Sequence, residues 1–330
     1  MRLFISSFLT LLTTWSLLSC SSGKNPKPDT TIVALAHIDS VPEIPTFNGD
    51  SAMAYIRKQV DFGPRVPQTL SHARCVEWLV SVLENTADTV IATHENTVHP
   101  VTRRNIPVQN IFARYNTEVQ QRILLLAHYD TRPWADEDLD PSKHNTPIDG
   151  ANDGASGVGV ILEIARQAAD FLPKEKGLDI LFVDQEDSGD YGNDDTWCLG
   201  SALWASNIEK YYPDGRKPRF AILLDMVGGK DATFYREYIS ESAVPYVNDL
   251  IWKTAATSGY SSFFKNSVGG AITDDHLPLL RAGIPAVNVI DMRGNGFNPT
   301  WHTTDDNYEN IDPATVTAVG TVITNVVFQK

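Results

Sequence analysis

The stretch Ile123-Leu124-Leu125-Leu126-Ala127, followed by His128-Tyr129-Asp130, decides the fold class. It is a short continuous apolar run that ends in polar residues able to bind a metal. Runs of this kind are typical of strands that are buried on both faces of a largely parallel sheet. Three further apolar runs follow, and acidic residues end each of them. They cover residues 178–183, ending in Asp184-Gln185-Glu186-Asp187; residues 220–224, ending in Asp225; and residues 286–290, ending in Asp291.

Helical patterns separate these runs. After the glycine-rich residues 150–157, apolar residues such as Val160 and Ile164 recur at helical spacing, and residues 246–256 and 313–327 are further helix candidates. Alternating strands and helices predict an α/β fold, a three-layer α/β/α sandwich with a mostly parallel, mixed central sheet. Such sheets bind ligands beyond the carboxyl ends of their strands. The acidic residues that end the runs therefore lie where a functional site is expected.

The first part of the chain predicts a targeting segment. Residues 1–19 contain one early arginine and then an apolar stretch, which is typical of a signal peptide and short for a membrane span. The sequence Leu17-Leu18-Ser19-Cys20 resembles a bacterial lipoprotein signal, so we expect a lipid on Cys20; an ordinary secretory signal is the alternative. Residues 20–45 lack periodicity and predict a flexible tether. Residues 46–330 predict a single domain.

The composition limits the compartment and the partners. A net charge of −14 argues against a nucleic-acid partner. A lipid on Cys20 predicts a protein anchored in the bacterial cell envelope, on the periplasmic side, and we expect the domain to be monomeric. Cys75 lies in an apolar helical pattern typical of a core residue. A disulfide between Cys75 and Cys198 is permitted outside the cytoplasm, but it does not follow from the sequence.

Three residues have the chemistry of zinc ligands. Asp153, Asp187 and His302 supply two carboxylates and one imidazole, which leaves an open position of the kind that catalytic zinc needs. Two carboxylates only neutralise a divalent ion, so the ion remains a Lewis acid. Glu186 stands beside a ligand and is free to move protons. Each residue alone has an ordinary explanation as a cap, a solvated turn or a surface histidine. Their joint placement predicts a site.

These residues resemble the zinc aminopeptidase superfamily and, within it, the animal-type glutaminyl cyclases. The resemblance runs from about residue 62 to residue 312. Three features favour the cyclases over the aminopeptidases: Asp274-Asp275-His276, the tryptophan directly before His302, and Asp305-Asp306-Asn307. The motifs that carry the resemblance as a whole are His128-Tyr129-Asp130, the loop around Asp153, Glu186-Asp187, Asp225 and Trp301-His302-Thr303.

The resemblance implies a cofactor and a set of roles. It implies a zinc-dependent catalytic domain over residues 46–330, with one zinc ion per chain on Asp153, Asp187 and His302. It also implies that Glu186 acts as general base and acid.

Further residues are implied around this centre. Asp225 and Asp274 would form a hydrogen-bonded carboxylate cluster with Glu186, and like charges at close range would raise the pKa of Glu186 toward neutrality. The implied pocket walls are Phe297, Trp301 and, with ordinary packing as an equal alternative, Trp197.

Two features depart from the animal enzymes. Those enzymes usually carry two glutamates where this chain has Glu186-Asp187, and aspartate is one methylene shorter, so the metal or the loop must shift slightly. The acidic segment 187–195 and the segment 134–144 look specific to this branch. We expect both segments to shape the rim of the pocket.

The activity implied by the resemblance is that of a glutaminyl-peptide cyclotransferase, an acyltransferase that converts N-terminal glutamine of peptides and proteins to pyroglutamate and releases ammonia. A two-zinc aminopeptidase is the main alternative, because His128 and Asp225 could hold a second zinc with Asp153 as the bridge. Asp274 and Trp301 favour the cyclase. A non-catalytic binding protein would be expected to lack a ligand or the base, and this chain keeps all of them.

Overall fold

A six-stranded mixed sheet forms the centre of the computed structural model, which describes residues 44–293 and 296–329. Its strands are β1 (Thr89–Ala92), β4 (Ile111–Tyr115), β5 (Arg122–His128), β6 (Gly177–Val183), β7 (Phe220–Asp225) and β10 (Ala286–Ile290). Their order across the sheet is β1-β4-β6-β5-β7-β10. The last four in this order are parallel to one another, while β4 is antiparallel to both of its neighbours.

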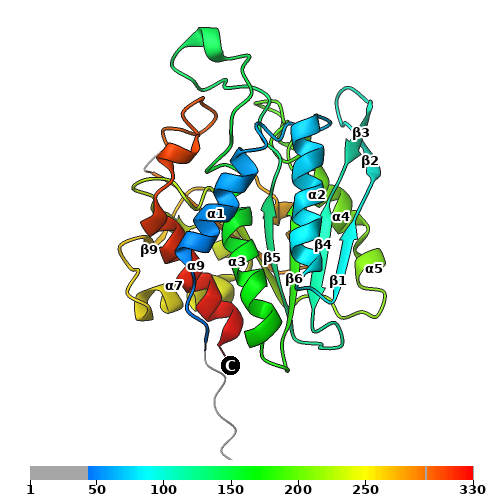
Figure 1. The fold of residues 1–330 in the computed structure, drawn as a ribbon, viewed down its shortest axis with the longest axis vertical. Helices are drawn as coiled ribbons and strands as arrows, with labels where there is room; N and C mark the ends of the chain where they lie inside the picture. Colours follow the sequence, from blue (N-terminus) through cyan, green and yellow to red (C-terminus); the bar gives the residue numbers. More distant parts are fainter. Residues whose placement is uncertain (1–43, 294–295, 330) are drawn as a thin grey trace, which may run out of the picture. The chain divides into compact units, whose positions relative to one another are not determined.

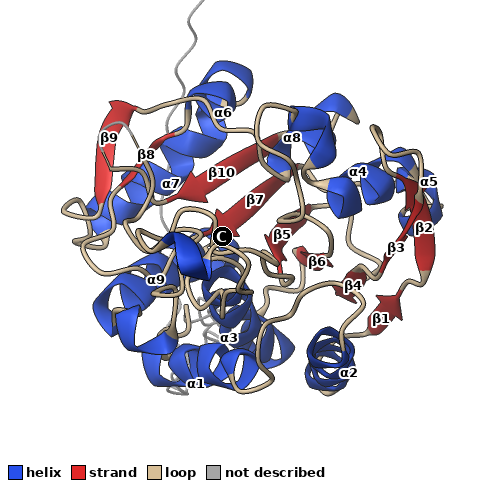
Figure 2. Cartoon of the chain, turned by 90° about the horizontal axis from the view of Figure 1, so that it is seen from above, coloured by secondary structure: helices blue, strands red, loops and turns tan. Residues whose placement is uncertain are grey.

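Helices cover both faces of the sheet (Figures 1 and 2). They are α1 (Gly49–Val60), α2 (Leu70–Glu84), α3 (Ala155–Phe171), α4 (Leu199–Ser206), α5 (Ile208–Tyr211), α6 (Tyr238–Ala243), α7 (Pro245–Thr257), α8 (His276–Arg281) and α9 (Pro313–Phe328). On one face lie α2 and α3, with α1 and α9 packed on α3, and on the other lie α4 and α8. The predicted three-layer α/β/α sandwich is confirmed.

Short elements complete the described part of the chain. A hairpin joins β2 (Glu95–Val98) to β3 (Asn105–Val108), and β8 (Phe234–Arg236) pairs in parallel with β9 (Phe264–Val268). Three short 3₁₀ helices cover Pro141–Lys143, Asp194–Thr196 and Tyr308–Asn310.

The four apolar runs form strands because both of their faces are covered. Every residue of β5, β6, β7 and β10 is buried. The helix that follows the glycine-rich loop lies close to this sheet, since a Cβ atom on Gly157 would collide with the backbone carbonyl oxygen of Leu224. Glycine at this position therefore lets α3 approach β7, which brings the start of α3 to the carboxyl edge of the strands.

Both cysteines of the described chain are buried free thiols. Cys75 is fully buried on α2, which confirms its prediction as a core residue. The disulfide that the sequence left open is not formed in the structure. The predicted signal peptide, Cys20 and most of the predicted tether lie outside the described residues. Within the described ranges, no helix is both long enough and apolar enough to cross a membrane.

A buried ion pair joins the two central strands at the end away from the acidic residues. The Arg122 Nε and Nη2 atoms donate to the carboxylate oxygens of Asp179 at 2.9 and 2.5 Å, and both side chains are fully buried. The Tyr212 hydroxyl donates to the same carboxylate at 2.9 Å, and Arg114 Nε donates at 3.3 Å. Because this carboxylate has several donors, its desolvation is offset within the fold.

We expect Asp179→Asn to lower the free energy of unfolding by about 3–5 kcal/mol, because it leaves two buried arginines without a counter-charge. Urea unfolding measures the loss as a lower midpoint. Asp214→Asn is the control, since Asp214 pairs with Arg216 at a partly exposed site and its loss should cost less than about 1 kcal/mol. Equal midpoints for Asp179→Asn and the parent would contradict the assignment.

Candidate active site

A pocket of about 320 Å³ opens beyond the carboxyl ends of the parallel strands. Its lining includes every residue that the sequence predicted for the site. These residues are Asp153, Glu186, Asp187, Trp197, Asp225, Asp274, Phe297, Trp301 and His302. The structure thus brings the predicted residues together from five separate segments, while their individual roles stay predictions.

The three predicted metal ligands come from different loops and meet in the pocket. Asp153 precedes α3, Asp187 follows β6 and His302 follows β10. The His302 Nε2 atom lies 3.0 Å from a carboxylate oxygen of Asp187 and 3.4 Å from one of Asp153. Both oxygens of Asp187 are buried and have no well-oriented hydrogen-bond donor among the described residues, although Arg132 Nη1 lies 3.9 Å from one of them. Burying such a carboxylate is costly unless a cation compensates it, so these residues fit a bound metal ion.

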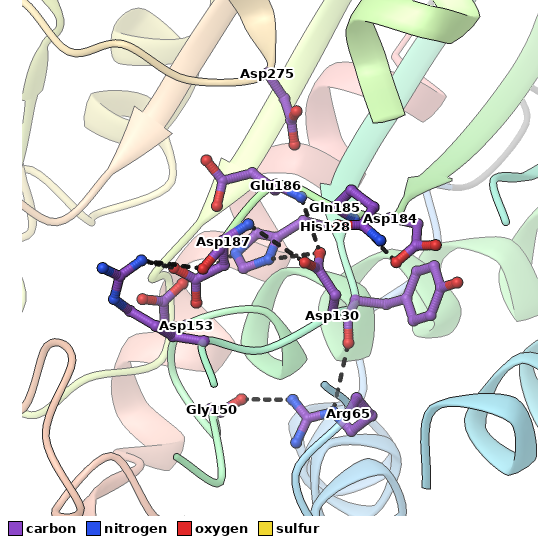
Figure 3. A network of polar contacts seen from close by, with 12 residues as sticks. Arg65, His128, Asp130, Gly150, Asp153, Asp184, Gln185, Glu186, Asp187 and Asp275 are labelled. Carbon is purple, nitrogen blue, oxygen red and sulfur yellow. Dashed lines mark hydrogen bonds and ion pairs between the residues drawn. The ribbon is translucent and has the colours of Figure 1, made fainter. Parts of the chain in front are cut away.

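Backbone hydrogen bonds hold two of these ligands in place. The carboxylate of Asp130 accepts the backbone N–H groups of Glu186 and Asp187, both at 3.3 Å (Figure 3). On the other side of the pocket, the buried carboxylate of Asp306 accepts the backbone N–H groups of Asn152 and Asp153 at 2.7 and 3.1 Å. Each ligand loop is therefore tied to an acidic residue that does not itself face the pocket.

The backbone around the pocket adopts the left-handed region at several non-glycine residues. These are Gln185, Cys198, Met226 and His302, with φ values of 58°, 56°, 49° and 53°. This conformation is unfavourable for residues with a side chain and tends to cluster at functional sites. The strain fits a site whose side chains must point in directions that regular structure does not provide.

Burial and charge both perturb the acids of the pocket. Burial raises the pKa of Glu186 well above its usual 4.5, and the carboxylates of Asp275 and Asp274 raise it further against the opposing charge of His128. Burial, together with the charge of Asp225, also raises the pKa of Asp274 to about 7. A carboxyl group perturbed in this way can both take and give a proton near neutral pH.

The pKa of the proposed histidine ligand is also raised, which for a histidine favours the charged form. Burial opposes its charge, but the carboxylates of Asp187 and Asp153 outweigh burial and raise the pKa of His302 to about 9. His302 must therefore give up a proton before it can act as a metal ligand.

The structure places the three acids of the predicted carboxylate cluster together but does not test their mutual hydrogen bonds. Glu186, Asp225 and Asp274 line one pocket, but each hydrogen bonds to a residue outside the trio. Glu186 accepts from the Cys198 thiol at 3.4 Å, Asp225 lies 3.2 Å from His128 Nε2, and the Asn288 amide donates to Asp274 at 2.6 Å. A direct hydrogen bond within the trio stays a prediction, because it needs one of the three to be protonated.

Aromatic rings enclose the proposed ligand His302. The Trp301 ring lies 3.8 Å from the His302 ring and 4.7 Å from the Phe297 ring, measured between centroids. Trp197 is parallel to His302 within 5°, at 6.1 Å. For Trp197, the structure favours the pocket-wall alternative over ordinary packing, because its ring lines the pocket.

Comparison with known proteins extends these observations. The sequence pattern of peptidase family M28 matches residues 110–327, which include all of the predicted site residues. The chain belongs to peptidase family M28.

Some relatives of this M28 member are named as glutaminyl cyclases, and others are named as zinc-dependent exopeptidases. A glutaminyl cyclase from Bacteroides thetaiotaomicron, bound to N-acetylhistamine, is 42% identical with a TM-score of 0.83, over 87% of this chain and 100% of that chain. A Zn-dependent exopeptidase from Parabacteroides distasonis is also 42% identical, with a TM-score of 0.82 over the same shares. The glutaminyl-peptide cyclotransferase of Drosophila melanogaster is 24% identical over 312 residues, which are 86% of this chain and 82% of that protein.

Sequence reasoning missed two residues of this M28 site. Arg132 is almost fully buried, and its Nη1 atom donates to the backbone carbonyl oxygens of Asp187 and Gly189 at 3.1 and 3.2 Å. The hydroxyl of Tyr191 lies 2.7 Å from Nδ1 of His302. The only sequence signal was their position in or next to the segments predicted to shape the rim, since a single arginine or tyrosine forms no motif.

A buried glutamate supports another side of the pocket. Glu237 caps α6 by accepting the backbone N–H groups of Ile239 and Ser240, and it also accepts the N–H of Ile272, a pocket-lining residue, at 3.0 Å. Burial opposes the charge of Glu237, but His276 and the backbone donors outweigh it and lower the pKa to about 2. The ionised form therefore stabilises the fold.

We expect Glu237→Gln to reduce the free energy of unfolding by up to about 3 kcal/mol at pH 7, because the fold lowers the pKa of Glu237 to about 2 and so stabilises its ionised form. A lowered pKa gives stability that is present above about 4.5 and disappears as the pH falls toward about 2. Unfolding curves of parent and variant should therefore converge in acid. Glu309→Gln, at an exposed site, is the control. A difference that does not depend on pH would refute this role.

Proposed function

We propose that this chain is a glutaminyl-peptide cyclotransferase that converts N-terminal glutamine to pyroglutamate and releases ammonia. The observation that carries the proposal is a partly buried glutamate with a raised pKa, Glu186, next to a trio of proposed metal ligands in a pocket walled by aromatic rings. The M28 family and the names of the glutaminyl cyclase relatives support the same activity. The substrates are peptides or proteins with N-terminal glutamine.

One zinc ion per chain fits the pocket. Asp153, Asp187 and His302 would hold it, and the buried, donor-free oxygens of Asp187 supply the charge that it would neutralise. Zinc bound there supplies Lewis-acid polarisation of the glutamine γ-carbonyl group. The exopeptidase relative, which is described as Zn-dependent, supports this choice of metal.

The chain's own residues handle the protons. A bond forms between the α-amine nitrogen and the side-chain amide carbon, and the bond from that carbon to the amide nitrogen breaks. Glu186 takes a proton from the attacking amine and gives one to the departing ammonia, so the carboxylate is regenerated. Burial and the neighbouring carboxyl groups of Asp275 and Asp274 favour a protonated Glu186 between the two transfers, and Asp225 lies in the same pocket.

The aromatic walls position the substrate and exclude water. Nucleophile and electrophile belong to one residue, so confining the glutamine side chain brings them together at a low entropic cost. Trp197, Phe297 and Trp301 would form the confining surface. Water excluded from the pocket cannot compete with the amine and yield glutamate.

The two-zinc aminopeptidase remains the alternative because a second ligand group exists. Ligand atoms of His128, Asp153 and Asp225 lie within 4.8 Å of one another. In the structure, His128 Nε2 lies 3.0 Å from Asp153 and 3.2 Å from Asp225, an arrangement that suits a protonated imidazole between two carboxylates. Burial opposes that protonation, but Asp130, Asp153 and Asp225 together raise the pKa of His128 well above its usual value. A second metal at this position would have to displace that proton, as zinc must at His302.

We expect a glutamine-initiated peptide incubated with the zinc-loaded protein to lose one ammonia and keep its full length, as measured by mass spectrometry. Metal analysis should find one zinc per chain. Glu186→Gln should reduce turnover by at least about 10²–10⁴-fold, the usual contribution of a general acid and base, and should keep the zinc, since Glu186 is not one of the proposed ligands.

Glu175→Gln, an exposed change outside the pocket, is the matched control and should turn over normally. Release of the free N-terminal residue together with two zinc ions per chain would establish the aminopeptidase instead. Unchanged turnover in Glu186→Gln would remove Glu186 from the mechanism.

We also propose that the protein is a monomer that a lipid on Cys20 anchors to a membrane of the bacterial cell envelope, on the periplasmic side. The lipoprotein-like sequence 17–20 and the tether predicted over residues 20–45 support this placement. We expect Cys20→Ser to move the protein from the membrane fraction to the soluble fraction. A variant that stays with the membranes would refute lipid anchoring at Cys20.

A further inference from the structure

The hydroxyl of Tyr191 contacts the far nitrogen of a proposed zinc ligand. It lies 2.7 Å from Nδ1 of His302, whose other nitrogen, Nε2, faces Asp187 and Asp153. A histidine that binds a metal nearly always donates its second N–H to a carboxylate, a backbone carbonyl or water. The closest carboxylate, that of Asp136, is 3.8 Å from Nδ1 and outside hydrogen-bond range. The phenol oxygen of Tyr191 therefore occupies the position of the usual acceptor.

Neighbouring side chains fix the ring of Tyr191 although about half of its surface is exposed. The ring centroid lies 5.7 Å from that of Trp197 and 6.2 Å from that of Trp301, both at steep angles. The guanidinium of Arg132 lies 4.9 Å from the same centroid, a distance at which a cation attracts the face of an aromatic ring. A ring held on three sides presents its hydroxyl to His302 at a small entropic cost.

Arg132 connects this ring to a second proposed ligand. The same guanidinium that approaches the Tyr191 ring donates to the backbone carbonyl oxygen of Asp187 and, through Nε and Nη2, to Asp136. Tyr191 and Asp187 are thus positioned by one almost fully buried cation. The acidic segment 187–195 begins with the proposed ligand Asp187. Its Tyr191 contacts the other proposed ligand, His302.

We propose that Tyr191 is a positioning residue for the zinc site: its hydroxyl accepts the N–H of His302 Nδ1, which leaves Nε2 unprotonated and directed at the metal. Tyr191 acts through His302 and does not bind the metal itself. The proposal rests on the ligand set given under the proposed function. It gives segment 187–195 a role in holding the metal in addition to its expected role at the pocket rim.

Tyr191→Phe tests this role, because it keeps the ring in the wall and removes only the hydroxyl. We expect the zinc affinity of the variant, measured by competition with a chromogenic chelator, to fall by about 10–100-fold, the usual effect of losing such a partner. Tyr246→Phe is the matched control, since it removes the hydroxyl of a similarly exposed tyrosine on α7. Its zinc affinity should equal that of the parent.

Thermal unfolding separates positioning from general stability. The chelator-treated Tyr191→Phe protein should unfold at the parent's temperature, and a fixed excess of zinc should raise its Tm less than it raises the parent's. At saturating zinc, cyclisation by the variant should approach the parent rate. A second variant, Tyr191→Leu, also removes the ring and should combine the same loss of zinc affinity with a higher KM.

Two results would overturn the proposal. One is a parent-like zinc affinity in both Tyr191 variants, and the other is an equal fall in Tm with and without zinc, which would assign the hydroxyl a structural role only. The zinc measurement does not depend on cyclisation. If the parent binds zinc but does not cyclise glutamine, the proposed function fails while the role of Tyr191 is still decided by its zinc affinity.

Discussion

Buried negative charge at the carboxyl ends of the parallel strands is the constraint on which the rest of this structure depends. Asp153, Glu186, Asp187, Asp225 and Asp274 share one pocket, and the described residues that line it include neither lysine nor arginine, although Arg132 lies 3.9 Å from Asp187 behind the lining. Desolvated carboxylates at such short range are costly unless cations or protons compensate them. Both kinds of compensation fit this pocket. Asp153 and Asp187 lie beside His302, where a metal ion fits, and Asp274 lies beside Glu186, whose raised pKa favours a bound proton.

Support for this charge comes from residues behind the pocket. Asp130 and Asp306 hold the two ligand loops through backbone N–H groups, and Arg132 anchors the turn after Asp187. Left-handed backbone at Gln185 and His302 accompanies these bonds. The site therefore depends on hydrogen bonds that fix the backbone. The stability of the surrounding fold offsets the cost of the left-handed residues.

Much of the fold was predictable from local patterns, and the site was predictable in its composition. The four buried runs became β5, β6, β7 and β10, because a strand covered on both faces needs continuous apolar sequence. The ligands were predictable because strand ends converge at one edge of a parallel sheet. The hydrogen bonds of Glu186 and Asp274 were not, since Cys198 and Asn288 reach them from other parts of the fold.

The sequence by itself determined the fold class, the family and the residue types available for chemistry, because periodicity and motif spacing are local properties of the chain. Only the tertiary structure decided which nitrogen of His302 faces the ligand group, where Tyr191 and Arg132 lie, and which oxygens of Asp187 are left without donors. Those features depend on differences of a few tenths of an ångström in the distances between side chains and loops that the fold brings together. Such distances follow from packing in three dimensions, and spacing along the chain does not encode them.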